Sequence, residues 1–112
     1  MVNKGKFIQY KDFIVANTGI SGLVPGVYYI MVTAVWCAPC QKLKAELQTI
    51  LFPKGRDLVL IDYDADTSAR IDFLNGTDKT IPKLFKIVVN KEGISTRILW
   101  RNNILLKDFC ND

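Results

Sequence analysis

The 112-residue chain contains no histidine and only three cysteines, Cys37, Cys40 and Cys110. Without histidine, it can form neither a Cys-His nor a Ser-His nucleophile pair, and no histidine-ligated metal site. Three cysteines alone cannot complete an ordinary structural zinc shell within one chain, so we expect no bound metal. They are also too few for a disulfide framework, so a hydrophobic core must stabilise the fold.

Long apolar segments are absent as well. The run from Val27 to Val35 has nine residues, far fewer than the ~20 that cross a bilayer. The amino-terminal residues include Lys4 and Lys6 but lack the apolar segment of a secretory signal. We therefore expect no membrane association and a cytoplasmic location.

Dense runs of one charge are missing too. Fifteen Lys and Arg residues against eleven Asp and Glu give a net charge of +4, and the basic residues are scattered along the chain. This distribution is typical of a solvated surface, and we expect no nucleic-acid partner. With 49% hydrophobic and 23% charged residues, the composition indicates one globular domain over residues 1–112. No apolar surface stripe is evident, which favours a monomer.

The sequence WCAPC at residues 36–40 joins an apolar run to a helical pattern. The preceding run at 27–35 predicts a strand that is buried on both faces, as is typical of a central parallel strand. After it, Cys40, Leu43, Leu47, Ile50 and Leu51 form one stripe of a 3.6-residue helix, which we expect to run from Pro39 to about Phe52. Two thiols at a strand-to-helix turn are close enough to form a reversible disulfide.

The helical pattern assigns different roles to the two thiols. Cys40 belongs to the apolar stripe and should point toward the core, whereas Cys37 precedes the helix at its positive amino end. Unpaired backbone N-H groups there stabilise a thiolate, and a hydrogen bond from Cys40 would add to that effect. We therefore predict that Cys37 is the nucleophile, facing solvent, and that Cys40 is the resolving thiol.

Apolar periodicity and turn residues predict the remaining elements. In chain order these are a short edge strand at 7–10, a helix at 11–17 ending near Gly19, the strand at 27–35, the helix after Pro39, a strand at 57–64, a helix at 66–74, strands at 83–90 and 94–100 joined as a hairpin, and a last helix from Asn103.

This order of elements, with the WCxPC motif and Ile81-Pro82 forty-two residues after Cys40, resembles the thioredoxin family over essentially the whole chain. The resemblance implies an α/β thioredoxin fold, a central mixed sheet flanked by helices in the order β-α-β-α-β-α-β-β-α. It also implies that Pro82 is cis and lies beside the redox pair. The backbone of Ile81 would then pair with an extended substrate segment.

The resemblance also assigns a substrate-binding rim. Trp36, Ala38 and Pro39 would form an apolar, uncharged edge that suits docking onto protein disulfides. A core position for Trp36 is the alternative. Cys110 is interpreted as a small core residue on the last helix, with a regulatory or dimerising thiol as the alternative.

Five positions depart from the usual pattern of the family: Met31, Ala38, Gln41, Leu60 and Arg101. Met31 replaces a buried acid that assists proton transfer at the resolving cysteine, and Leu60 replaces its lysine partner. We expect slower proton delivery at Cys40 or a shifted redox poise. Ala38 stands for a glycine, Gln41 for a basic residue, and Arg101 for a glycine that opens the substrate groove. We expect Arg101 to narrow or charge that groove.

The leading interpretation is a protein-disulfide reductase that works by thiol-disulfide exchange. It needs no bound cofactor beyond its own reversible Cys37-Cys40 disulfide. Its partners would be protein disulfides and a recycling reductase such as a thioredoxin reductase. The alternatives are a glutaredoxin-like, glutathione-dependent enzyme and a protein-binding subunit that uses the surface around Trp36 and Pro82. An oxidase or isomerase would differ only in reduction potential.

Overall fold

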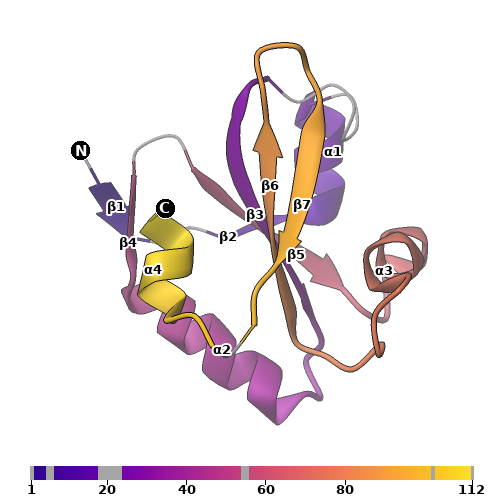
Figure 1. Cartoon of the computed structure of the whole chain (residues 1–112). Coiled ribbons are helices and arrows are strands. Elements are labelled where there is room, and N and C mark those ends of the chain that lie inside the picture. Colours follow the sequence, from indigo (N-terminus) through magenta and orange to yellow (C-terminus); the bar gives the residue numbers. More distant parts are fainter. Residues whose placement is uncertain (1, 5–6, 18–23, 54–55, 102, 112) are drawn as a thin grey trace.

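A five-stranded mixed sheet forms the centre of the computed structural model, which describes residues 2–4, 7–17, 24–53, 56–101 and 103–111 (Figure 1). In spatial order the strands are β2 (Phe7–Gln9), β5 (Asp57–Asp62), β3 (Gly26–Thr33), β6 (Lys83–Val89) and β7 (Ser95–Leu99). β3 pairs in parallel with β5 and antiparallel with β6; β2 joins β5 in parallel, and β7 joins β6 antiparallel.

In the described segments, four helices cover the two faces of this sheet. They are α1 (Tyr10–Asn17), α2 (Ala38–Thr49), α3 (Thr67–Leu74) and α4 (Leu106–Asn111). Phe13 of α1 and Phe73 of α3 belong to one apolar cluster, and Leu47 of α2 and Phe109 of α4 belong to another. The central mixed sheet flanked by helices agrees with the expected fold class.

The central strand β3 explains why there are two clusters. Successive side chains of a strand point to opposite faces, so Ile30 and Val32 enter the first cluster while Tyr29 and Met31 enter the second. The prediction of a strand buried on both faces is confirmed. It is parallel to only one neighbour, however, and it ends at Thr33, with Val35 84% exposed beyond it.

The predicted carboxyl end of the second helix is wrong. α2 stops at Thr49, Ile50 is extended, and β4 (Leu51–Pro53) pairs antiparallel with β1 (Val2–Lys4). Phe52, 2% exposed, packs its ring 5.3 Å from that of Tyr29. Pro53 disfavours helical backbone at the preceding residue, and this small second sheet forms between segments far apart in sequence, which local periodicity cannot reveal.

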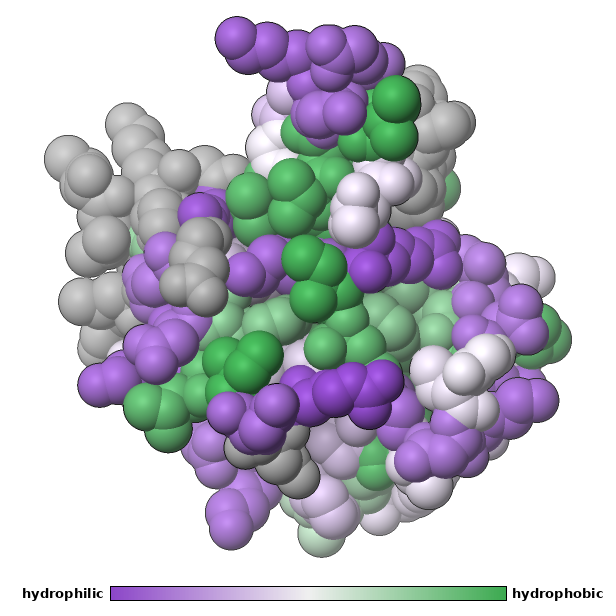
Figure 2. Space-filling model, viewed as in Figure 1, coloured by the Kyte–Doolittle hydropathy of each residue, from purple (hydrophilic) through white to green (hydrophobic). Residues whose placement is uncertain are grey.

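The other elements match the predictions with small shifts. The hairpin of β6 and β7 and the helix at 67–74 are present, while α4 begins at Leu106 instead of Asn103. Gly19, the predicted end of the first helix, lies outside the described residues. Figure 2 shows patches of apolar residues, separated by hydrophilic bands, on the face of the molecule that carries β7 and α4. Within the described segments, no helix has the length and apolarity needed to cross a membrane.

Candidate redox site

Cys37 is the N-cap of α2, and Cys37 and Cys40 are joined by a disulfide with their Cα atoms 5.2 Å apart. The extended backbone of Cys37 lets its sulfur accept a hydrogen bond from the Cys40 backbone N-H at 3.2 Å. This satisfies one of the N-H groups that a helix leaves unpaired at its start. The Cys37 N-H in turn donates to the Ala34 carbonyl at 3.2 Å, which closes the turn between β3 and α2.

The two sulfurs differ in their access to solvent. Cys40 is completely buried in the apolar cluster beneath α2, as its place in the helical stripe predicts. Cys37 retains 6% exposure, less than the solvent-facing position we expected. It nevertheless lines an open groove, so the structure brings Cys37 and not Cys40 to the surface.

This groove, here called the docking groove, has a volume of about 430 Å³ and contains all three residues of the predicted rim. Its lining residues are Trp36, Cys37, Ala38, Pro39, Tyr63, Lys79, Thr80 and Ile81. Sequence reasoning missed Tyr63, Lys79 and Thr80. Tyr63 follows the end of β5, next to the end of β3, and sites in α/β sheets gather at the carboxyl ends of strands. This rule could have indicated Tyr63 as a site residue from the sequence alone.

Trp36 lies on the surface of the docking groove. It is 61% exposed, so the alternative of a core position is wrong. Its indole N-H donates to Asp64 Oδ2 at 2.8 Å, and its ring meets that of Tyr63 edge to face at 5.7 Å. These contacts hold a large apolar surface beside Cys37.

The Ile81-Pro82 peptide is cis, as the resemblance implies. Cys37 Sγ lies 3.9 Å from the Ile81 carbonyl oxygen, so this peptide is next to the disulfide. Ile81 also lines a second groove of about 650 Å³, here called the side groove, together with Pro82 and Arg101. The structure thus places Pro82 and the exposed Arg101 in the side groove, and Ile81 in both grooves.

The loop before Pro82 is held by Lys83. Its ammonium donates to Asp78 Oδ1 at 2.7 Å and to the carbonyl and hydroxyl oxygens of Thr80 at 2.6 and 2.8 Å. The hydrogen bonds from Lys83 and Thr80 lower the pKa of Asp78 to about 2. The positive charge of Lys83 is therefore paired with Asp78 within the loop, whereas Arg101 places an exposed positive charge in the side groove.

The position of the family's buried acid is apolar here. Met31 is 1% exposed and belongs to the same cluster as Cys40, and Leu60 lies directly opposite it in the strand register. Gln41 donates its side-chain amide to the Ala34 carbonyl at 2.9 Å and so supports the turn. Any proton for Cys40 must reach it without a carboxyl group at position 31.

Cys110 is fully buried in α4, and burial raises the pKa of its thiol to about 12. Its carbonyl accepts hydrogen bonds from the Tyr29 hydroxyl at 2.5 Å and from the Arg56 guanidinium at 2.8 Å. These surroundings match the prediction of a small core residue.

Comparison with known proteins identifies the fold. No family model and no curated protein sequence matches the chain. Its structure is similar to the crystal structure of chloroplastic thioredoxin z, with a TM-score of 0.57 and 18% sequence identity, over 98% of this chain and 94% of that chain. The likeness shows that this chain has the thioredoxin fold, which the resemblance in sequence implied.

Proposed function

We propose that this chain is a thiol-disulfide oxidoreductase that reduces disulfides of other proteins through Cys37 and Cys40. One observation carries the proposal: the two cysteines are bonded at the amino end of α2, and only Cys37 lines the docking groove. A pair placed in this way can be reduced and reoxidised while only one of its sulfurs contacts the substrate.

The reaction begins from the reduced pair. The Cys37 thiolate attacks one sulfur of the substrate disulfide; a Cys37-substrate disulfide forms, and the other substrate sulfur leaves as a thiolate that takes a proton from water. Cys40, once deprotonated, attacks Cys37 Sγ, which releases the second substrate thiol. Two electrons pass to the substrate, and the Cys37-Cys40 disulfide remains.

The structure supplies the stabilisation that Cys37 needs as a thiolate. The helix amino end contributes roughly 0.3 to 2 kcal/mol, and a hydrogen bond to a charged acceptor about 1.5 to 3 kcal/mol. In the structure the donor for that bond is the Cys40 backbone N-H. We expect these two effects together to favour the Cys37 thiolate over the neutral thiol. No general base is required.

Two neighbouring features supply the substrate site. The Ile81 backbone lies beside Cys37 Sγ, and the loop before the cis proline leaves it outside the β6 ladder, available to pair with an extended segment. The exposed, apolar Trp36 would pack against the same segment. Both contacts are independent of substrate sequence, which suits a reductase that acts on many protein disulfides.

A trapping experiment tests the proposal. The Cys40→Ser variant should accumulate Cys37-linked mixed disulfides with proteins, because the second step is blocked. Cys37→Ser with Cys40 intact is the matched control and should trap nothing. If neither variant forms a mixed disulfide with a model protein disulfide such as insulin, the proposal is wrong.

A protein-binding subunit without a redox role is the second candidate, favoured by the 61% exposure of Trp36. For a binding subunit, Cys37→Ser leaves affinity for the partner unchanged and Trp36→Ala reduces it. For a reductase, Cys37→Ser removes turnover. Assays with glutathione as the only electron donor distinguish the glutaredoxin-like alternative, and equilibration with a glutathione buffer places the reduction potential.

The proposal extends to the surroundings of the enzyme. The oxidised pair returns to the dithiol by exchange with an external reductase of the thioredoxin reductase kind, and no bound cofactor is involved. A reducing compartment such as the cytoplasm suits this direction of electron flow. We propose that the active form is a monomer, which size-exclusion chromatography with light scattering tests.

A further inference from the structure

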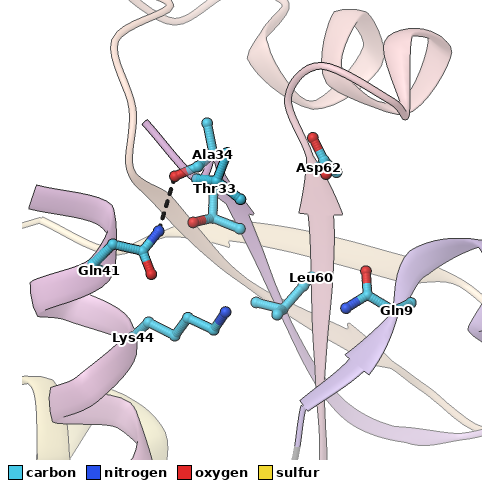
Figure 3. Close-up of a pocket in the computed structure, with 8 residues that line it drawn as sticks. Gln9, Thr33, Ala34, Gln41, Lys44, Leu60 and Asp62 are labelled. Atoms are coloured by element: carbon cyan, nitrogen blue, oxygen red, sulfur yellow. Dashed lines mark hydrogen bonds between the residues drawn. The ribbon is translucent and has the colours of Figure 1, made fainter. Parts of the chain in front are cut away.

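A pocket, here called the polar pocket because most of its lining residues are polar, lies between α2 and the ends of β3 and β5 (Figure 3). Its volume is about 180 Å³. The residues that line it are Gln9, Thr33, Ala34, Val35, Gln41, Lys44, Leu60 and Asp62. It lies where the parallel strands β2, β3 and β5 end, the usual place for ligands in an α/β sheet.

The strand register explains why polar residues meet there. Gln9 of β2 lies opposite Leu60, and Thr33 of β3 lies opposite Asp62, so all four occupy the sheet face that α2 covers. Gln41 and Lys44 are three residues apart on α2 and therefore project from the same side of the helix. The α2 residues complete a wall opposite the strands.

Thr33 provides the strongest indication that the pocket has an occupant. The residue is 8% exposed, and its Oγ1 has no hydrogen-bond partner among the residues that the structure describes. A buried hydroxyl without a partner is destabilising, and such groups are uncommon in folded proteins. In Figure 3 the Thr33 hydroxyl and the Lys44 ammonium both point into the space between α2 and β5.

The charges in the pocket are separated. Lys44 lies on the α2 side, with its ammonium 5.8 Å from the centre of the Phe7 ring. Asp62 lies at the end of β5, where its Oδ1 accepts hydrogen bonds from the backbone N-H groups of Asp64 at 2.9 Å and Ala65 at 3.2 Å. A ligand that matches both sides has a negative group near Lys44 and a hydrogen-bond donor near Asp62.

We propose that this pocket binds a small hydroxy- or amino-carboxylate. The carboxylate accepts a hydrogen bond from the Lys44 ammonium and, once the side chains around it move aside, one from the Thr33 hydroxyl, which has almost no accessible surface in this structure. The hydroxyl or ammonium group of the ligand donates to Asp62. The volume equals that of about six water molecules, which is too little for a drug-sized ligand. The inference stands on the pocket alone and does not depend on the redox chemistry of Cys37.

Titration of the ¹⁵N-labelled protein with glycolate and with glycine tests the proposal. Saturable shifts should appear in the side-chain amide signals of Gln9 and Gln41, which can be observed directly. Acetate, which lacks the donor, and methylammonium, which lacks the carboxylate, should bind at least several-fold more weakly. Equal or tighter binding of either fragment would overturn the assignment of the ligand.

Two variants connect the shifts to the pocket. Thr33→Val keeps the shape and removes the hydroxyl, and Lys44→Gln removes the charge; each should weaken binding about tenfold or more, as expected when a bond to a charged group is lost. Lys42→Gln, on an exposed part of the same helix, is the matched control and should bind as the unaltered chain does.

The stability of Thr33→Val separates loss of binding from loss of folding. Because the hydroxyl has no partner, its removal should leave the melting temperature without ligand unchanged or raised. No saturable shift with either probe, or equal affinity in Lys44→Gln and Lys42→Gln, would mean that the pocket holds only water and that the proposal is wrong.

Discussion

Cys37 and Cys110 belong to the same apolar cluster on one face of the sheet, but their surroundings differ in each property that controls thiol chemistry. Cys37 caps the amino end of α2, receives a backbone N-H and lines the docking groove. Cys110 lies within α4, has no exposed surface, and has its pKa raised to about 12 by burial. Within a single core, the comparison separates a position suited to thiol-disulfide exchange from one that is not.

The position of each thiol in the fold distinguishes Cys37 from Cys110 more clearly than its exposure to solvent does. Cys37 is itself only 6% exposed, so accessible area alone separates the two thiols weakly. The helix amino end and the adjacent groove distinguish them, because they stabilise the thiolate and provide an approach for a second sulfur.

Replacing each cysteine in turn should give the largest difference. Cys37→Ser should reduce the rate of insulin reduction by dithiothreitol to that without the protein, because the attacking sulfur is gone. Cys110→Ala should keep the rate per folded molecule within about twofold and only lower stability, since it empties a small buried volume. Turbidity from the released insulin chain measures the rate, and circular dichroism confirms folding.

An essential thiol at Cys110 would reverse this result. In that case Cys110→Ala would lose activity while still folded, and the interpretation of Cys110 as a core residue would be wrong. The alternative of a dimerising thiol predicts a covalent dimer under oxidising conditions that Cys110→Ala abolishes.

Alkylation of the reduced protein with iodoacetamide tests the same contrast without mutation. Burial raises the pKa of Cys110 to about 12, so its thiolate fraction near pH 8 is much smaller than in an unfolded chain. Cys37 should be labelled within minutes, and Cys110 only after denaturant is added. Mass spectrometry of the peptides identifies the sites, and equal labelling of Cys37 and Cys110 in the native protein would contradict the comparison.

Tyr29→Phe should affect only the Cys110 end of the cluster. The Tyr29 hydroxyl donates to the Cys110 carbonyl and accepts from Arg56 at 2.7 Å, in a buried site. Its loss should lower the free energy of unfolding by about 1 to 2 kcal/mol. Urea denaturation measures the change, and the rate of insulin reduction per folded molecule should stay unchanged. A loss of activity without a loss of stability would show that the surroundings of Cys110 are coupled to the reaction at Cys37.

The parts of the fold with a strong local signal were predictable. The apolar run of β3, the stripe of Cys40, Leu43 and Leu47 on α2, and the hairpin of β6 and β7 all have patterns within one segment. The pairing of β1 with β4 depends on contact between segments about fifty residues apart, and no local pattern contains it.

The candidate site divides in the same way. The WCAPC motif and Ile81-Pro82 indicated the disulfide and its neighbour through the resemblance. Tyr63, Lys79 and Thr80 joined the docking groove only through tertiary structure. The polar pocket was equally hidden, because Thr33 reads as part of an apolar strand, and its unpartnered hydroxyl is visible only once β3, β5 and α2 are placed.

Arg101→Gly tests whether the charge of the side groove affects the reaction at Cys37. Arg101 places an exposed positive charge in the side groove, while Lys83 is neutralised by Asp78. The variant should slow reduction of disulfides flanked by acidic residues about two- to fivefold, and the difference should shrink as salt rises. Lys91→Gln, in the exposed hairpin turn, is the control. If Arg101→Gly reduces acidic, neutral and basic disulfide peptides at unchanged rates, Arg101 is not part of the substrate site.

Asp78→Asn should give the smallest effect, a pH-dependent one in the loop that leads to Pro82. The folded-state pKa of Asp78, about 2, lies below its ordinary value of 3.8, so its contribution to stability is present above pH 4 and is lost as the pH falls toward 2. The unaltered chain should therefore melt slightly above Asp78→Asn at pH 6, and the two should converge near pH 2. Because Asp78 is exposed, the difference should also shrink in high salt. A constant difference from pH 6 to pH 2 would show that the carboxylate charge does not hold this loop.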